Sequence, residues 1–340
     1  MKRQAIFIPR ADRPRFPALA FVLSAAVLPC AAGDRIQVAE DTASQAVTFS
    51  LGQKPLAVYH NKLDPMPHVH LLYTRGGVNV IAGDSSKLPH PGHWGIFFGT
   101  YLSDAGSRLD FFHGAAKEVP SPAKVFQADI KEAKKTGFSQ ELVWKSTTVA
   151  GKVLLKEKRS VAMYQHAAFA NATVLEWQTE LSCPEGTDKV VLQGYDFAGL
   201  GVRMLNAVGD LFGESERCDA GQNNRWIKGL WLAYVYHPEG GQQVTVAVYD
   251  HPDNPRHPKN WCGLNRPFEF GYVGPGLNLD NDPYAILAGR SMKLRYCVAA
   301  WDGKVGKGEV AAVLAAWREL TAGNAPEQQG ADKAAGSKPR

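Results

Sequence analysis

Apolar and polar residues alternate along most of this chain, and the alternation has a period of two. Residues 175–180, 244–249 and 292–298 show this pattern most clearly. It is typical of β-strands that bury one face and leave the other wetter. Clusters of Gly, Pro, Asn and Asp separate such segments, as at 75–77 and 238–241, and clusters of this composition form turns. Many strands at close intervals predict an all-β fold of antiparallel sheets stacked as a sandwich.

A single segment has the spacing of an amphipathic helix. The apolar side chains of residues 309–320 recur at helical intervals, and Gly323 follows closely enough to end a helix there. Residues 323–340 have almost no apolar bulk. Such a composition predicts a disordered tail, because too little surface can be buried to offset the loss of chain entropy. No internal repeat or linker interrupts the remainder, so we expect one domain over residues 35–322.

The first 33 residues have the parts of a secretory signal peptide. Residues 2–16 carry five Lys and Arg against one Asp, an apolar stretch follows at 18–28, and small residues stand at 31–33. The eleven residues of the apolar stretch are too few to cross a bilayer of about 30 Å as a helix. We therefore expect residues 1–33 to be removed on export to the periplasm or beyond. A retained anchor, or a lipid attached at Cys30, is the alternative.

Charge and cysteine content narrow the possible partners. The net charge of +5 is modest and partly located in the leader and the tail, so no basic stripe for nucleic acid is indicated. After residue 34, no window approaches the roughly 18 uninterrupted apolar residues of a membrane-spanning helix.

Four cysteines follow the leader: Cys183, Cys218, Cys262 and Cys297. In an oxidising compartment they could form two disulfides in any of three pairings, and their spacing does not match a thiolate zinc site.

Polar chemistry concentrates first in residues 88–99. His90, His93 and Trp94 lie in a Pro- and Gly-rich turn immediately before an apolar strand. Turn residues held by a rigid sheet are a common location for binding chemistry. We therefore predict a functional role for this turn.

More histidines lie near this turn in the sequence. His68 and His70 alternate onto one face of an earlier strand, and Asp110 precedes His113 near the end of a later one. Imidazole is a common ligand of transition metals, so the group suggests a metal site. The alternative is that His68 and His113 are ordinary polar residues at strand ends. We assign no metal ligand and no cofactor.

The second concentration is the loop 249–261, whose three prolines restrict the backbone at every third residue. Its candidate residues are Asp250, His251, Asn254, Arg256, His257 and Trp261. A rigid loop so rich in acidic, basic, amide and aromatic groups predicts a binding or catalytic role. The alternative is a stiffened surface loop whose polar groups face water. Adjacent strand residues point to opposite faces, so the side chains of Asp250 and His251 are not expected to share one task.

A third segment, residues 195–205, places Gly199 and Gly201 ahead of Arg203. Two glycines without a third, and without a following helix, are weak evidence for a nucleotide loop. They fit better a strand that bends or admits a ligand close to its backbone. Arg203 would then project towards that ligand, or else form a structural salt bridge.

The order of several segments resembles a bacterial family that is commonly labelled the PmoA family, or "methane oxygenase PmoA". These segments are HPGHWGIFFG, LDFFHG, GLGVRM, NRWIKG, VTVAVYDHPDNPRHPKNW and MKLRYCVAAWDG. The resemblance runs from about residue 55 to 303 and is most specific at 250–261. The family pattern has another His where Gly92 stands and Arg where Trp94 stands.

The oxygenase label refers to a membrane protein of several spanning helices, which this chain lacks, so we do not expect that activity. The resemblance implies instead a β-supersandwich of the galactose mutarotase-like kind. Because such proteins often accompany sugar-processing enzymes, it also implies, by analogy, a carbohydrate substrate.

We therefore expect an exported enzyme that acts on a glycoside or oligosaccharide as a hydrolase, lyase or epimerase. His93 and His251 are the candidate proton-transfer groups, with Asp250 or Asp110 to orient an imidazole or act as the complementary base. The candidate substrate-binding residues are His90, Trp94, Arg203, Asn254, Arg256, His257 and Trp261. A non-catalytic sugar-binding module is the second hypothesis, and a metal on His90, His93 and either His251 or His257 is the third. The first requires His93, Arg203 and residues 250–261 to converge in one concave pocket.

Overall fold

The computed structural model describes most of the chain after the leader. The described residues are 35–62, 66–104, 107–112, 116–195, 197–205, 209–214, 223–238, 241–266, 270–279 and 282–322. The predicted signal peptide and the predicted disordered tail lie outside these ranges. All described residues belong to one unit, residues 34–340.

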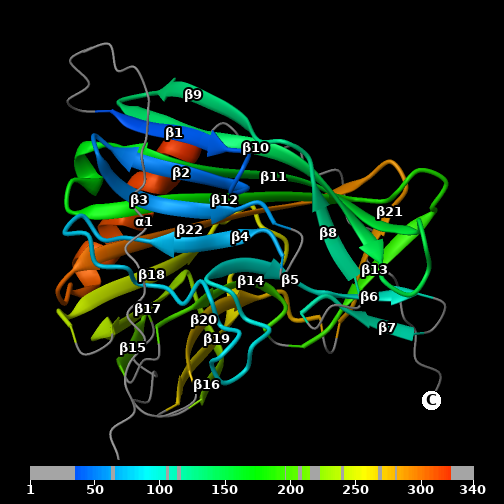
Figure 1. Ribbon diagram of the computed structural model, residues 1–340. Helices are drawn as coiled ribbons and strands as arrows, with labels where there is room; N and C mark the ends of the chain where they lie inside the picture. The colour runs from blue at the N-terminus through cyan, green and yellow to red at the C-terminus, as the bar shows by residue number, and fades with distance from the viewer. Residues whose placement is uncertain are drawn as a thin grey trace, which may run out of the picture. The chain divides into compact units, whose positions relative to one another are not determined.

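Strands dominate the described residues and pair antiparallel throughout, in two sheets of nine strands and one of four (Figure 1). The first sheet contains, in spatial order, β1 (Ile36–Asp41), β2 (Ala46–Leu51), β3 (Lys54–His60), β4 (His68–Leu72), β5 (Ile96–Gly99), β14 (Gly199–Arg203), β20 (Phe270–Gly276), β19 (Lys259–Arg266) and β16 (Asn223–Gly229).

The second sheet contains β15 (Gly209–Gly213), β17 (Trp231–Tyr236), β18 (Val244–Asp250), β22 (Ser291–Asp302), β12 (Ala172–Ser182), β11 (Val153–Gln165), β10 (Ala133–Ser146) and β8 (Ala116–Pro120), with β9 (Lys124–Ile130) also paired to β10. The small third sheet extends from one end and contains β21 (Tyr284–Leu287), β13 (Lys189–Gln193), β6 (Tyr101–Asp104) and β7 (Ser107–Asp110). The all-β antiparallel sandwich predicted from the alternation is confirmed.

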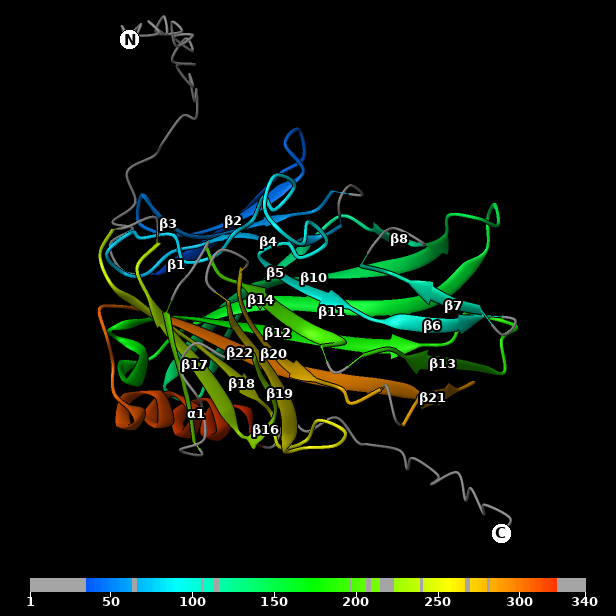
Figure 2. The ribbon, with the colours of Figure 1, turned by 90° about the horizontal axis from the view of Figure 1, so that it is seen from below.

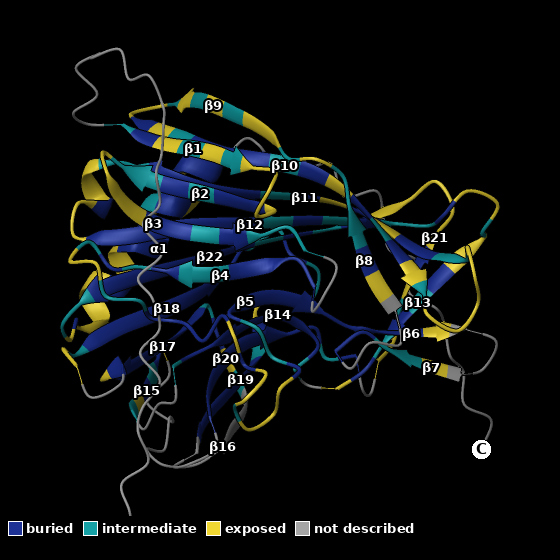
Figure 3. Ribbon diagram, in the orientation of Figure 1, coloured by how far each residue is buried: buried dark blue, intermediate teal, exposed yellow. Residues whose placement is uncertain are grey.

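The alternation decides which side chains fill the space between the two large sheets. In β12, Leu175 and Trp177 point inwards, and in β5 Phe98 does the same from the opposite sheet. Strands β5, β14, β18 and β20 are buried along their length, whereas β1 and β9 at the margins expose every second residue (Figure 3). Burial of this apolar surface is the main favourable term in the stability of such a sandwich.

The C-terminal helix α1 (Lys307–Thr321) covers the outer face of the second sheet (Figure 2). It buries Val310, Val313 and Trp317 in a cluster with Tyr249 and Trp301 of that sheet. The helix predicted at 309–320 is confirmed, and it ends two residues before Gly323. A 3-10 turn, η1 (Ala167–Phe169), lies near it. Among the described helices, none is long and apolar enough to span a membrane.

Arg159 lies in the core and holds a polar network. Its guanidinium donates to the carboxylates of Glu157 (2.8 Å) and Glu118 (2.7 Å) from the second sheet. It also donates to the Tyr59 hydroxyl (3.1 Å) and the Pro67 carbonyl (3.0 Å) of the first sheet. Burial, together with the charge of Glu157, raises the pKa of Glu118 to about 8 although Arg159 acts in the opposite direction. The network ties the two sheets together.

The two disulfides considered from the sequence are not formed. They would use all four cysteines, but Cys183 and Cys297 are free thiols. Cys297 is buried under α1, and the Cys183 thiol donates to the Ile286 carbonyl (3.1 Å). Cys218 lies outside the described residues.

Candidate functional site

The turn at residues 88–95 folds over the outer face of the first sheet. The Gly95 amide donates to the Ala82 carbonyl (2.8 Å), and the Gly95 carbonyl accepts from the Arg203 amide (2.8 Å). These bonds fix the turn beside β14. His90 adopts a φ of 56°, a backbone region that residues other than Gly occupy rarely.

His93 is surrounded by aromatic rings on this outer face. The centroid of its ring lies 5.6 Å from those of Phe97 and Tyr272 and 5.5 Å from that of Phe270. These rings gather here because the neighbouring positions on the same strands, Ile96 and Val273, face the inner core. We call this group, with His90, Trp94 and Arg203, the outer-face patch.

Arg203 is the most unusual member of the outer-face patch. Its side chain is buried, with 0% of the residue exposed. Nη2 donates to the Pro89 carbonyl (2.8 Å), and the guanidinium carbon lies 4.2 Å from the centroid of the Phe270 ring. Nε and Nη1 are buried and have no hydrogen-bond partner among the described residues. Burial lowers the pKa of Arg203 to about 10, so the group stays charged at neutral pH.

The glycines that precede Arg203 have a packing role. A side chain at Gly201 would come within 2.8 Å of the rings of Phe97 and Tyr272, and Gly199 has a φ of 132°. At Gly201 the space expected for a ligand close to the backbone is filled by these two rings of the protein itself.

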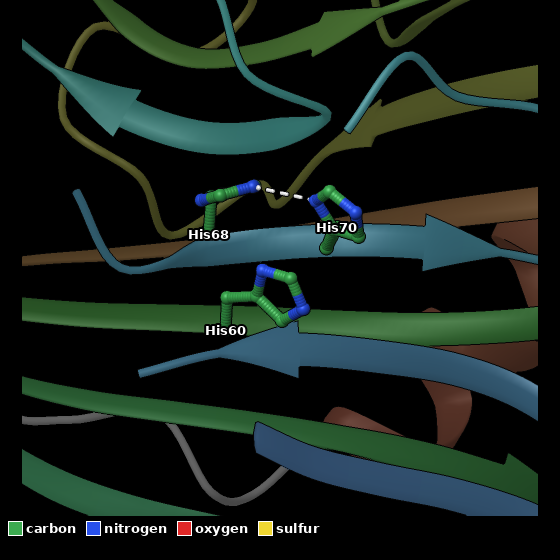
Figure 4. A group of neighbouring side chains, drawn as sticks. All are labelled: His60, His68 and His70. Atoms are coloured by element: carbon green, nitrogen blue, oxygen red, sulfur yellow. Dashed lines mark hydrogen bonds between the residues drawn. The ribbon is translucent and has the colours of Figure 1, made fainter. Parts of the chain in front are cut away.

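Next to the outer-face patch, three histidines gather on β3 and β4 (Figure 4). His60 is paired directly with His68 across the two strands, and His70 follows two residues later on the same face. His68 Nε2 lies 3.2 Å from His70 Nδ1, and the rings of His60 and His70 stack with their centroids 3.9 Å apart. One ring nitrogen from each residue lies within 4.8 Å of the others. We call this group the histidine triad, and the ring of Trp94 lies 6.0 Å from that of His68.

The histidine triad is neutral at physiological pH. Burial lowers the pKa of His68 to about 3 and that of His60 to about 4. Burial also lowers the pKa of His70, although a hydrogen bond with the backbone of Gly83 opposes this. Each ring therefore offers a lone pair on one nitrogen and a proton on the other.

The loop after β18 satisfies its own polar groups. The Asp250 carboxylate accepts from Asn254 Nδ2 (2.7 Å) and from His257 Nδ1 (2.6 Å). Asn254 also bonds both backbone groups of Arg295 on β22, each at 2.7 Å. The His251 ring lies against α1, where Nε2 is 2.9 Å from the Thr321 hydroxyl. These contacts fasten the loop to the second sheet and the helix.

The structure does not bring this loop and the outer-face patch together. Arg203 is paired with Tyr272 on β20, whereas Arg256 donates to the carbonyls of Leu277 and Asn278 beyond the other end of that strand. Five residues of strand separate the two positions by about 17 Å. Trp261 is buried in the inner core, and its indole N–H donates to the Gly229 carbonyl (2.8 Å), so this ring cannot stack on a ligand.

The surroundings of two candidate acid–base residues, His251 and Asp110, bear on the roles expected of them. Burial, followed by the charge of Arg295, lowers the pKa of His251 to about 4, which removes the reason for assigning it proton transfer near neutrality. Asp110, at the end of β7, accepts from the Phe112 amide (2.8 Å). The Phe112 ring packs 5.9 Å from that of His93, so this hydrogen bond links Asp110 to a neighbour of the outer-face patch.

The sequence profile of a family of unknown function (DUF6807) matches residues 46–315. The chain belongs to the DUF6807 family. The matched region contains the outer-face patch, the histidine triad and the loop after β18. No curated protein sequence matches this chain.

Solved structures resemble this DUF6807 protein only distantly. The GH36 α-galactosidase AgaB from Geobacillus stearothermophilus is 10% identical, with a TM-score of 0.49 over 78% of this chain and 41% of that enzyme. A variant of the GH36 α-galactosidase AgaA from the same organism, in complex with raffinose, is 10% identical, with a TM-score of 0.44 over 79% and 41%. A protein assigned as a kojibiose phosphorylase, from the human microbiome, is 9% identical, with a TM-score of 0.33 over 81% of this chain and 32% of that protein. The chain thus spans about two fifths of the α-galactosidases.

The DUF6807 chain also has a groove of about 410 Å³ on the outer face of the second sheet. It is lined by β10, β11, β12 and β22 and by His251, Asp253 and Asn254 of the loop after β18. Its charged residues are mixed in sign: Lys124, Glu141, Lys158, Glu180, Lys293 and Arg295. Part of the predicted loop thus faces a groove, but on the opposite side of the sandwich from His93.

Sequence reasoning found His68 and His70 on one strand face but missed His60. The polarity of His60 was visible, since the alternation that buries Tyr59 turns its neighbour outwards. What was missing was the register of β3 against β4, which alone places His60 opposite His68.

Proposed function

We propose that this DUF6807 member is an exported carbohydrate-active enzyme that binds a glycoside or oligosaccharide at the outer-face patch. The observation that carries the proposal is the buried guanidinium of Arg203, whose Nε and Nη1 have no partner among the described residues. An unsatisfied buried donor costs about 1–3 kcal/mol. A ligand oxygen that accepts from these nitrogens would remove that cost, which accounts for an arginine at this position.

The surroundings of Arg203 favour an oxygen-rich ligand with apolar faces. The ring of Trp94 is partly exposed and offers apolar area, and His90 and His93 add polar groups above the buried rings of Phe270 and Tyr272. Sites for small molecules typically combine aromatic walls with a few placed polar groups. Sugar hydroxyls accept hydrogen bonds from guanidinium and imidazole N–H groups, and sugar C–H faces pack on aromatic rings.

Within this proposal, His93 is the proton-transfer group and Asp110 the complementary base. Imidazole transfers protons efficiently near neutral pH, and the reaction would be a hydrolysis, an elimination or an epimerisation. His251, Asp250 and Asn254 are left out, because their contacts hold the loop to β22 and α1.

The test is binding of a panel of oligosaccharides by calorimetry, followed by product analysis by NMR. Arg203→Met should weaken binding at least tenfold, and His93→Gln should keep binding while losing turnover. Lys158→Ala, in the groove of the second sheet, is the matched control and should change neither. Binding lost in Lys158→Ala but kept in Arg203→Met would move the ligand to the groove and refute the proposal.

Two further results decide its remaining parts. Wild-type protein that binds sugars but converts none would be a non-catalytic sugar-binding module. Sequencing the N-terminus of the protein recovered from the periplasm or medium tests export, and a chain that stays in the cytoplasm with residue 1 intact would contradict it.

A further inference from the structure

The arrangement of the histidine triad leads to an inference that is independent of sugar binding. We propose that His60, His68 and His70 bind one divalent transition metal ion, with zinc as the metal that their chemistry fits best. Three neutral imidazoles with a remaining open position form a known ligand set for zinc.

The spacing of the nitrogen atoms supports this assignment. In a tetrahedral zinc site with Zn–N bonds of about 2.0–2.1 Å, ligand nitrogens lie roughly 3.3 Å apart. His68 Nε2 and His70 Nδ1 are 3.2 Å apart, so these two already have the spacing of one edge of such a tetrahedron. A metal ion would replace the hydrogen bond between them (Figure 4). The ligand nitrogen of His60 lies within 4.8 Å of the other two. To bind the same ion, its ring would have to turn out of the stack with His70.

His68 has the supporting hydrogen bond that metal-binding histidines commonly have. Its Nδ1 donates to the Met66 carbonyl at 2.7 Å. A carbonyl can only accept, so the proton is on Nδ1 and the lone pair on Nε2, the nitrogen that faces His70. In metal sites, such a bond fixes the tautomer and the orientation of the ring.

The backbone that carries the histidine triad is held from behind. Arg159 donates to Tyr59 and to the carbonyl of Pro67, and these two residues directly precede His60 and His68. A side chain at Gly83 would come within 2.5 Å of His70 Nδ1, so the glycine allows the backbone to pass this close to the His70 ring. Metal sites need ligands whose positions are fixed by their surroundings.

The charged groups near the histidine triad differ in sign. The charge of Lys62 lowers the pKa of His60 and of His70, whereas the charge of Asp84 raises the pKa of His70. His68 is 1% exposed, while His60 and His70 are half-buried. Because these two rings are only half-buried, a metal ion that they hold would keep a fourth position for water or a ligand oxygen.

The experiment uses the full chain without a histidine tag, stripped with EDTA and titrated with ZnCl₂ by calorimetry, with elemental analysis of the loaded protein. We expect one zinc per chain and a rise in Tm on binding, because only the folded state holds the three rings together. His60→Gln and His70→Gln should each weaken binding at least tenfold. His237→Gln is the matched control, since His237 is exposed and bonded to the Gly241 carbonyl of its own turn.

Wild-type protein that takes up no zinc, or a His70→Gln variant that binds it with unchanged affinity, would overturn the proposal. If the variants fail to fold, the visible spectrum of wild-type protein loaded with Co²⁺ decides. Intense tetrahedral bands support a three-imidazole site, and the weak bands of an octahedral ion, or no uptake, refute it. None of these measurements depends on sugar binding or turnover.

Discussion

The same substitution should destabilise this protein strongly at one buried arginine and hardly at all at another. Arg159 and Arg203 are 1% and 0% exposed. The guanidinium of Arg159 donates to two carboxylates, a hydroxyl and a carbonyl. That of Arg203 has one donated bond, and two of its nitrogens have no partner among the described residues. Replacing each with Met keeps the length of the side chain and removes the charge.

The expected cost for Arg159→Met is large. The substitution leaves the carboxylate of Glu157 buried without its cation and removes the donor to the Glu118 carboxyl group, and breaking a buried ion pair in this way costs about 3–5 kcal/mol. For a domain of this size, that corresponds to a fall in Tm of roughly 5–8 °C.

For Arg203→Met the gains and losses nearly cancel. The bond to Pro89 is worth about 1.5–3 kcal/mol, and the contact with the Phe270 ring about 0.5–2 kcal/mol. Removing two unsatisfied donors raises the free energy of unfolding by about 1–3 kcal/mol for each donor. The exposed Pro89 carbonyl can accept a hydrogen bond from water instead. The free energy of unfolding should therefore stay within about 1 kcal/mol of wild type.

Urea unfolding at pH 7, followed by tryptophan fluorescence and circular dichroism, measures both variants on one scale. A shift in the midpoint with an unchanged m-value reports stability alone. If Arg203→Met were as destabilising as Arg159→Met, Arg203 would be a structural residue and the argument for a ligand there would fail.

Two other outcomes follow from the buried polar groups. The pKa of Glu118 is raised from 4.5 to about 8 in the folded protein, so between these values the folded state keeps a proton that the unfolded state has lost. Wild type should lose stability relative to Glu118→Gln as pH rises from about 4.5 to 8 and no further above it; a Tm difference that is flat across this window contradicts the assignment. Asn254→Ala removes the bonds to Asp250 and to both backbone groups of Arg295 and should cost about 2–3 kcal/mol without changing sugar affinity. If that variant loses sugar binding in a calorimetric titration, the loop after β18 is part of the binding site and the prediction is wrong.

The fold was largely predictable because its signals are local. The period of two along 175–180 and 292–298 matches strands β12 and β22, and the helical spacing at 309–320 matches α1. Each of these patterns needs only a few neighbouring residues. Which strands lie side by side is a property of the whole chain, and local alternation does not determine it.

The candidate site was less predictable for that reason. His93 and Arg203 both pack against Phe270 because β14 lies between β5 and β20, strands that are far apart in the sequence. In the loop after β18, composition could not show whether polar groups face a ligand or one another. Asp250 and His257 bond each other, and Arg256 bonds backbone carbonyls, so much of the polarity that suggested chemistry serves the loop itself.

The position of β22 in the second sheet has a consequence for the order in which the protein can fold. This strand lies between β12 and β18, although it is the last strand made. A growing chain that ends before Ser291 therefore presents two unpaired strand edges in the middle of a sheet, and such edges are sites of aggregation. Domains that fold from the N-terminus during synthesis would gain little here, because the second sheet closes only when residues 291–302 have left the ribosome.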